Sequence, residues 1–406
     1  MGKEVGSLPW KETCPMNERV QLVTLHQMGR FTVAELADMF GVSRKTVYKW
    51  ITRFAAEGTP GLQERSRAPH GHPNATPDAV IQAVVAAKQA HPSWGPAKLQ
   101  PRPQDPPEVM RQWPAASTRG DILARRGLTV ARRRRRRVPR WTQPFQQCEG
   151  PNAVWCADFK GWFRTGDGQR CDPLTITDAS SRFLVACQIV PRPDEAHVRP
   201  IFERVFQEYG LPSAIRTDNG SPFASVGVGG LSSLSVWWVK LGIRPERIEP
   251  GHPEQNGRHE RFHETLKAET LRPPSATPEA QQDRFTTFRA EYNTVRPHQA
   301  LGQVPPARLY VPSPRLFVPT PQDPAYAPST VVRRVRSNGQ IRWGGDMIFV
   351  SEALVGELIG VDEGADGWVV SFGPIPLGML RAGGRSLERL PAVGFPMGEF
   401  VTHVPG

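Results

Sequence analysis

The stretch NAVWCADFKGWF, residues 152–163, is apolar and aromatic and contains one carboxylate, Asp158. It predicts a β-strand, because aromatic and β-branched residues favour strands. An ionised side chain on a sheet is unfavourable unless it has a partner or a ligand. Asp158 is therefore the first candidate for a functional residue.

Alternating strand and helix patterns follow this stretch. RCDPLTITDASSRFLVACQIV (170–190) predicts two strands joined by a turn, and we assign Asp178 in that turn to structure. Further patterns predict helices over 195–210, 233–243 and 255–271, and strands over 213–220 and 244–250. This order is expected of a ribonuclease-H-like α/β core with a mixed sheet. The predicted fold class is multidomain α/β, with this core between N-terminal all-α modules and a C-terminal small β-barrel.

Two further carboxylates lie at positions in the predicted core where a functional residue is expected. Asp218 ends a predicted strand before a Gly turn, and Glu260 lies on the last of these helices. Carboxylates from separate elements that meet at one sheet edge suit Mg²⁺ or Mn²⁺, which prefer oxygen ligands. Asp218 in isolation also fits a plain turn residue, and Glu260 fits a solvated helix carboxylate. Three other glutamates could supply the third carboxylate in place of Glu260: Glu249, Glu254 and Glu264.

The N-terminal region predicts a compact helical module over 15–60. Thr32 and Ser43 are helix-capping candidates on either side of a Gly turn, which is the pattern of a helix-turn-helix. An ordinary three-helix bundle with a solvated basic face is the alternative. The side chains expected to contact DNA through the second helix of the pair are Arg44, Lys45, Thr46 and Lys49.

Charge is distributed unevenly along the 406 residues. Residues 1–150 hold 24 Lys and Arg against 12 Asp and Glu, whereas residues 151–406 hold 27 of each kind. A basic excess of this kind favours a polyanion as partner. After a linker at 61–77, a second helical DNA-binding module is expected at 78–140, although the proline-dense segment 100–109 interrupts its helices.

The second module ends in a run of six arginines. One interpretation is that the run lies along duplex DNA and contacts its phosphates. The alternative is that the run is a solvated tail without a binding role. The residues of the run are Arg132, Arg133, Arg134, Arg135, Arg136 and Arg137.

The C-terminal part predicts a linker at 311–328 and a small SH3-like β-barrel at 329–392, from its alternating pattern and its turn signals. Its arginines suit either a DNA backbone or solvated strand edges. The five cysteines form no CxxC pair, so we expect reduced thiols rather than disulfides or zinc. There is no signal core and no apolar run long enough for a membrane, so the expected location is cytoplasmic, nucleoid-associated when bound to DNA.

Four motifs carry a family resemblance. WCADFKGWF (155–163), IRTDNGSPF (215–223), PGHPEQNGRHERFHETLK (250–267) and YNTVRPHQALGQVPPARLY (292–310) resemble the integrase core of insertion-sequence transposases of the retroviral-integrase superfamily. The helix-turn-helix region resembles that of the same transposases. The resemblance implies a catalytic core at 148–310.

The resemblance also implies roles for individual residues. Asp158, Asp218 and Glu260 take the three positions of a catalytic Asp-Asp-Glu triad that holds Mg²⁺ or Mn²⁺, with two ions per site. Arg258 and Lys267 become candidate DNA contacts, although Lys267 equally suits an exposed ion pair. Secondary candidates around the triad are Asn219, His252, Asn256 and His259. The segment Arg296-Pro297-His298 is expected to close the domain against the sheet rather than to perform chemistry.

The expected function is that of a transposase or integrase, which hydrolyses DNA phosphodiesters and transfers strands. The implied partners are double-stranded DNA, as element ends and as target, and further copies of the chain in a homo-oligomer. One alternative is a repressor that keeps the fold without chemistry, for which a broken triad would be the sign. A nuclease of RNA–DNA hybrids is the other, and the helix-turn-helix argues against it.

Overall fold

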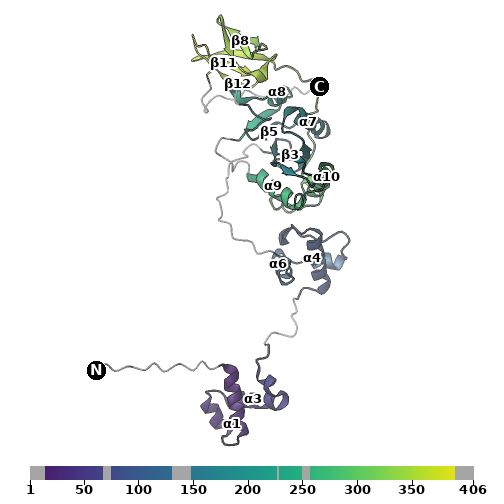
Figure 1. Cartoon of the computed structure of the whole chain (residues 1–406), viewed down its shortest axis with the longest axis vertical. Helices are drawn as coiled ribbons and strands as arrows, with labels where there is room; N and C mark the ends of the chain where they lie inside the picture. The colour runs from purple at the N-terminus through teal and green to yellow at the C-terminus, as the bar shows by residue number, and fades with distance from the viewer. Residues whose placement is uncertain (1–13, 67–74, 130–147, 226–227, 249–256, 389–406) are drawn as a thin grey trace, which may run out of the picture. The chain divides into compact units, whose positions relative to one another are not determined.

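The computed structural model describes residues 14–66, 75–129, 148–225, 228–248 and 257–388 (Figure 1). The chain divides into two compact units, Met1–Thr76 and Pro77–Gly406. Among the described residues, no helix combines the length and the apolar character that crossing a bilayer requires. Each unit is taken by itself below.

The first unit is a small helical module with α1 (Pro15–Gln27), α2 (Val33–Met39), α3 (Arg44–Glu57) and the short η1 (Thr59–Leu62). The predicted caps are confirmed, since the Thr32 hydroxyl accepts from the Glu35 amide in a full capping box and Ser43 accepts from Thr46. The helices bury one shared core, formed by Leu22, Val23, Leu36, Ala37, Val47, Trp50 and Leu62.

A second set of helices opens the other unit: α4 (Asp78–Ala90), η2 (Pro96–Lys98), α5 (Pro107–Arg111) and α6 (Ala116–Arg125). The proline-dense segment ends where α5 begins, with Pro106 as its N-cap and Pro107 at a position that tolerates a missing N–H. Helices and loops share a buried core of Val84, Ala87, Trp94, Leu99, Ile122 and Leu123. The prolines therefore change the direction of the chain, while the apolar residues of the module still pack into one core.

Residues 154–247 build one mixed sheet. Its strands are β1 (Val154–Phe159), β2 (Phe163–Arg164), β3 (Arg170–Asp178), β4 (Leu184–Val190), β5 (Ala214–Thr217) and β6 (Arg244–Arg247). The order is β2-β3-β1-β5-β6 with β4 on β3, and β1, β5 and β6 are parallel, whereas β3 is antiparallel to its neighbours. The predicted ribonuclease-H-like core with a mixed sheet is confirmed.

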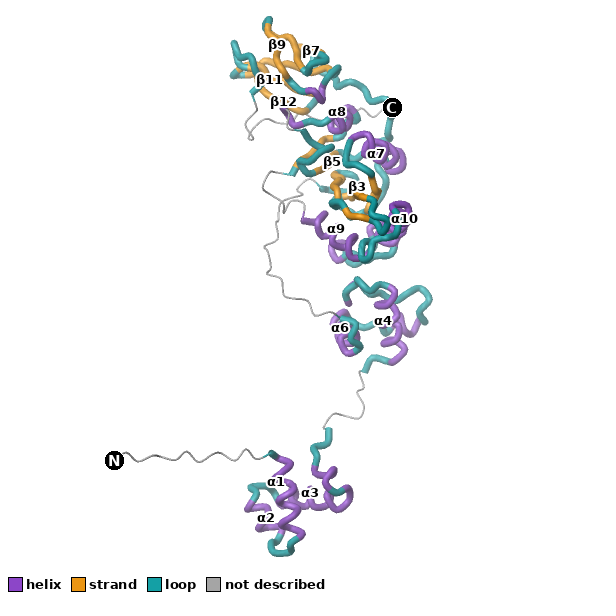
Figure 2. The backbone as a smooth tube through the Cα atoms, in the orientation of Figure 1, coloured by secondary structure: helices purple, strands orange, loops and turns teal. Residues whose placement is uncertain are grey.

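Helices cover both faces of this sheet (Figure 2). On one face, α7 (Glu195–Tyr209) and α8 (Ser233–Lys240) pack with Trp155, Phe202 and Trp238 in the main core. On the other face, α9 (Gly257–Thr270) and α10 (Pro278–Thr294) pack against β4 through Phe262 and Phe285. Side chains alternate across a strand, so Trp155 and Ala157 enter the α7 face and Asp158 belongs to the α9 face.

The C-terminal strands are β7 (Val331–Arg334), β8 (Gln340–Trp343), β9 (Asp346–Phe349), β10 (Leu358–Gly364), β11 (Gly367–Phe372) and β12 (Ile375–Leu380). They form a four-stranded sheet, β12-β11-β10-β7, and a separate β8-β9 hairpin. The expected closed barrel is not confirmed. A physical reason is that Val236 and Val239 of α8 enter the core of this region, so a helix covers apolar surface that a closing sheet would bury.

The turn after β3 is held by a buried carboxylate, as the assignment of Asp178 to structure requires. Asp178 accepts hydrogen bonds from the Asn152 amide (2.7 Å), the Ser181 amide (2.7 Å) and the Ser181 hydroxyl (2.6 Å). Burial raises the pKa of Asp178, and these hydrogen bonds oppose the shift. The carboxylate thereby joins the beginning of β1 to the end of β3.

We expect Asp178→Ala to lower the free energy of unfolding of the core by about 3 kcal/mol, because it leaves buried donors without an acceptor. Urea denaturation followed by tryptophan fluorescence measures the change. The control is Asp283→Ala on the exposed side of α10, which should have almost no effect. Equal free energies of unfolding of the two variants would contradict the structural role assigned to Asp178.

Candidate active site

Asp158 lies near the carboxyl end of β1 and is half-buried. It is paired in register with Thr175 of β3, whose hydroxyl donates to the Asp158 backbone carbonyl at 3.0 Å. The neighbouring Trp155 and Ala157 are buried in the main core and hold the strand in this register. The apolar residues of β1 thus determine which face carries the carboxylate.

Asp218 follows β5 directly and is exposed. The parallel pairing of β1 with β5 runs from Val154 opposite Ala214 to Cys156 opposite Arg216. Continuing this register by two residues places Asp218 level with Asp158, beyond the carboxyl end of the neighbouring strand. The Gly220 amide donates to the Asp218 carboxylate at 3.1 Å, and Asn219 binds the Ile248 carbonyl at 2.9 Å, which holds the loop near β6.

Glu260 lies in the first turn of α9 and is exposed. Its neighbour His259 is 4% exposed and is hydrogen-bonded to β3 through both ring nitrogens. The Nε2 atom lies 2.7 Å from the Thr175 hydroxyl and the Nδ1 atom 3.3 Å from the Thr177 hydroxyl. These bonds hold the beginning of α9 against the strand position opposite Asp158, one residue before Glu260.

The three predicted carboxylates therefore come from neighbouring elements, but they do not form a tight ligand group among the described residues. The group that does is Asp158, His259 and His263, whose ligand atoms all lie within 4.8 Å of one another. The sequence analysis placed His259 among the secondary candidates and assigned no metal-binding role to His263. Their spacing of four residues on a predicted helix was the signal that could have found them.

Burial dominates the electrostatics of the two histidines. It lowers the pKa of His259 to about 4. It also lowers that of His263 to about 2, with smaller contributions from His259 and from the positive charge of Lys160. Both rings are therefore neutral at neutral pH, and a neutral ring offers one nitrogen as an acceptor or a ligand.

Basic side chains lie near the carboxylates. Lys267, predicted as a DNA contact, is exposed in the last turn of α9. Lys160 directly follows β1; burial lowers its pKa, and the positive charge of Lys267 lowers it further. Sequence reasoning did not single out Lys160. The side chain of Arg258 lies outside the described residues, as do His252 and Asn256.

In the first unit, the predicted contacts are placed on α3. Arg44, Lys45 and Lys49 are exposed, and Thr46 is half-buried with its hydroxyl 2.9 Å from that of Ser43. The Lys49 ammonium also lies 4.3 Å from the ring centre of Trp50. The arginine run, Arg132 to Arg137, lies outside the described residues.

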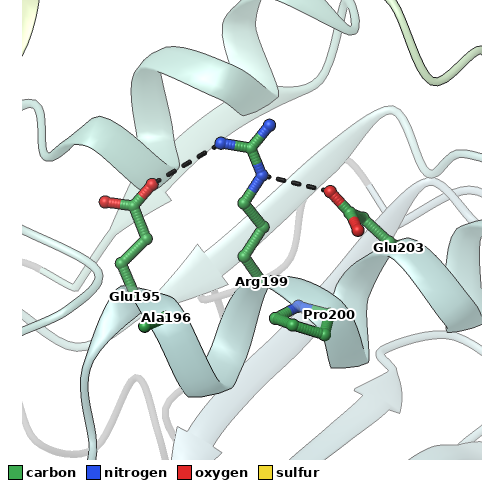
Figure 3. A pocket seen from close by; sticks show the side chains of 5 residues that line it. All are labelled: Glu195, Ala196, Arg199, Pro200 and Glu203. Atoms are coloured by element: carbon green, nitrogen blue, oxygen red, sulfur yellow. Dashed lines mark hydrogen bonds and ion pairs between the residues drawn. The ribbon is translucent and has the colours of Figure 1, made fainter.

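A surface hollow of about 400 Å³ lies elsewhere, along α7 (Figure 3). Figure 3 shows Arg199 between Glu195 and Glu203, at N···O distances of 3.8 and 3.1 Å. The arginine compensates both carboxylates, and no residue of the predicted triad lines the hollow. It is not the candidate site.

Parts of the chain match models of known domain families. Residues 149–253 and 241–306 each match a model described as an integrase core domain. Residues 18–70 match a helix-turn-helix domain, and residues 46–123 match a homeodomain-like domain.

Two curated relatives come from bacterial insertion elements. One is an uncharacterized 39.2 kDa protein of insertion element IS476 from Xanthomonas euvesicatoria, 32% identical over 39% of this chain and 44% of the relative. The other is an uncharacterized 31.7 kDa protein of insertion element IS407 from Burkholderia multivorans, 30% identical over 45% of this chain and 64% of the relative. The matches thus span about half to two thirds of the relatives' length.

Two solved structures are also similar. The HTLV-2 integrase catalytic core domain in complex with magnesium is 15% identical, with a TM-score of 0.32, over 40% of this chain and 99% of that one. The intasome of simian T-cell lymphotropic virus in complex with a PP2A regulatory subunit is 17% identical, with a TM-score of 0.37. The match covers 68% of this chain and 93% of that one.

The contact between α9 and β3 generates a prediction. Thr175→Val removes the hydroxyl shared by His259 and His263 and should lower the free energy of unfolding by about 1–3 kcal/mol, the cost of leaving a buried polar group unpaired. Chemical denaturation measures it. Thr286→Val on the exposed side of α10 is the matched control, and equal losses in both variants would contradict the account.

Proposed function

We propose that this chain, which carries an integrase core domain and N-terminal helix-turn-helix families, is a DNA transposase that cuts and joins strands at the Asp158, Asp218 and Glu260 site. The observation that carries the proposal is the parallel β1–β5 register, which, if continued by two residues, aligns Asp218 with Asp158. The His259–Thr175 contact supports the proposal, because it holds the residue before Glu260 against the strand that pairs with Asp158.

Asp158, Asp218 and Glu260 fit divalent metal ions of the Mg²⁺ or Mn²⁺ type. All three offer hard oxygen donors, and the exposure of Asp218 and Glu260 leaves room for the waters that Mg²⁺ keeps. Two such ions supply activation of the attacking oxygen and stabilisation of the leaving oxygen in an in-line phosphoryl displacement. The protein's part is to hold the carboxylates on rigid elements.

Other residues of the chain bind and orient DNA in this proposal. Arg44, Lys45, Thr46 and Lys49 begin the second helix of the helix-turn-helix, which is the part that enters a major groove. Lys267, Arg258 and the arginine run at 132–137 contact phosphates. Lys160 adds positive charge beside Asp158.

The reaction sequence is hydrolysis at an element end followed by strand transfer. Hydrolysis frees a 3′-hydroxyl, which then attacks a phosphodiester of target DNA and displaces a new 3′-hydroxyl. Two ends have to be joined to one target, so a homo-oligomer on DNA is part of the proposal. The alternative of a repressor without chemistry gains no support, because all three carboxylates are present.

The first test is strand transfer of a pre-cut end oligonucleotide into a plasmid with Mg²⁺ or Mn²⁺. Asp158→Asn, Asp218→Asn and Glu260→Gln should each reduce joining at least about 100-fold, as when one electrostatic stabiliser of a transition state is lost. Glu264→Gln, exposed on the same helix, is the control and should retain joining. Joining that survives all three substitutions would overturn the triad.

A second test concerns DNA binding. Arg44→Ala and Lys45→Ala should weaken binding to duplex DNA and lower the slope of log affinity against log salt by about one each, if each side chain neutralises one phosphate. Fluorescence anisotropy at several salt concentrations measures the slope. Arg204→Ala, an exposed substitution on α7, should leave it unchanged; a similar loss in this control would refute a specific role for α3.

A further inference from the structure

The segment HERFH, residues 259–263, places two histidines four residues apart on α9. On a helix this spacing directs both side chains to one face. Both Nε2 atoms approach the same hydroxyl, that of Thr175, at 2.7 Å from His259 and 2.8 Å from His263. The rings lie 4.6 Å apart and almost perpendicular. Two ring nitrogens thus converge on one point beside β3, where a bound metal ion would replace their hydrogen bonds to the Thr175 hydroxyl.

A carboxylate from another element completes the group. Asp158 of β1 is paired with Thr175, and a carboxylate oxygen lies within 4.8 Å of the histidine ligand atoms. In a tetrahedral zinc site, bonds of about 2.0–2.2 Å separate two ligand atoms by roughly 3.3–3.6 Å. The side chains therefore have to approach one another by at most about 1.5 Å on binding the ion.

The donor set selects a class of metal. Imidazole nitrogen suits Zn²⁺, Co²⁺, Ni²⁺ and Cu²⁺, whereas Mg²⁺ prefers oxygen alone. Two histidines from an H-E-x-x-H helix with one carboxylate form a three-ligand set known from zinc sites that keep a fourth position open. The positive charge of Lys160 acts on His263 and opposes cation binding, so the affinity of the site depends on its two imidazole ligands.

We propose that His259, His263 and Asp158 form a site for a transition-metal ion of the Zn²⁺ type. Asp158 is common to this site and to the carboxylate triad, so occupancy of the one site removes a ligand from the other. That consequence rests on the proposed function, whereas the binding site itself does not. Transition metal would therefore restrain DNA joining by competing for Asp158.

The test is a titration of the full untagged chain, freed of metal by a chelator, with Co²⁺ as the probe. We expect one Co²⁺ per chain with the visible absorption of a low-coordinate nitrogen-containing site, and full displacement by Zn²⁺. His263→Gln should weaken Co²⁺ binding by more than about 100-fold, beyond the loss that follows removal of an outer hydrogen-bond partner. Unchanged affinity in His263→Gln would overturn the proposal.

Matched variants separate the site from other histidines and carboxylates. His197→Gln alters a surface histidine beside Asp194 on α7, and Glu264→Gln alters an exposed carboxylate of α9 that belongs to neither proposed site; both variants should bind Co²⁺ as the unaltered chain does. A loss in His197→Gln equal to that in His263→Gln would assign the signal to surface histidines. Circular dichroism establishes that each variant is folded.

X-ray absorption at the cobalt edge of the unaltered chain keeps the proposal testable should His263→Gln fail to fold. Two imidazoles in the coordination shell are expected, and a shell of oxygen alone would overturn the proposal, leaving the histidines as hydrogen-bonded core residues. The titration contains no DNA. Failure of strand transfer with intact Co²⁺ binding would therefore count against the proposed function alone.

Discussion

The pairing of β1 with β3 on one side and β5 on the other is the constraint on which the rest of the site depends. A slip of one residue in either pairing would turn Asp158 toward the main core and bring Trp155 to the α9 face. The burial of Trp155 and Ala157 opposes such a slip, because full burial of large apolar side chains is worth about 1.5–3 kcal/mol each. The position of a charged side chain is thus set by its uncharged neighbours.

The second constraint is the docking of α9. Phe262 and Leu266 bury one side of this helix. His259 is hydrogen-bonded to two β3 hydroxyls through both ring nitrogens, and His263 to the Thr175 hydroxyl through Nε2. Glu260 is left exposed in the first turn of the helix. The helix thus presents two kinds of donor atom, an exposed carboxylate and two histidine rings held against β3.

Much of this organisation was predictable from local pattern. The strand at Asp158 and the caps Thr32 and Ser43 are set by residues close in sequence, and the structure agrees with each. The closed C-terminal barrel was not predictable, since Val236 and Val239, a hundred residues earlier, enter the core of that region. The histidine pair was visible as a spacing, yet its meaning depended on Thr175 and Asp158, which only the strand register brings to it.

The central claim is that the strand register unites Asp158 and Asp218 in one divalent-metal site. The most direct measurement is anomalous diffraction from crystals of the full chain grown with Mn²⁺ and with zinc-type metals excluded. The account predicts a manganese peak at the carboxylates of Asp158 and Asp218, with Glu260 also within reach of the ion. Manganese bound elsewhere, with these two carboxylates free of metal, would contradict it.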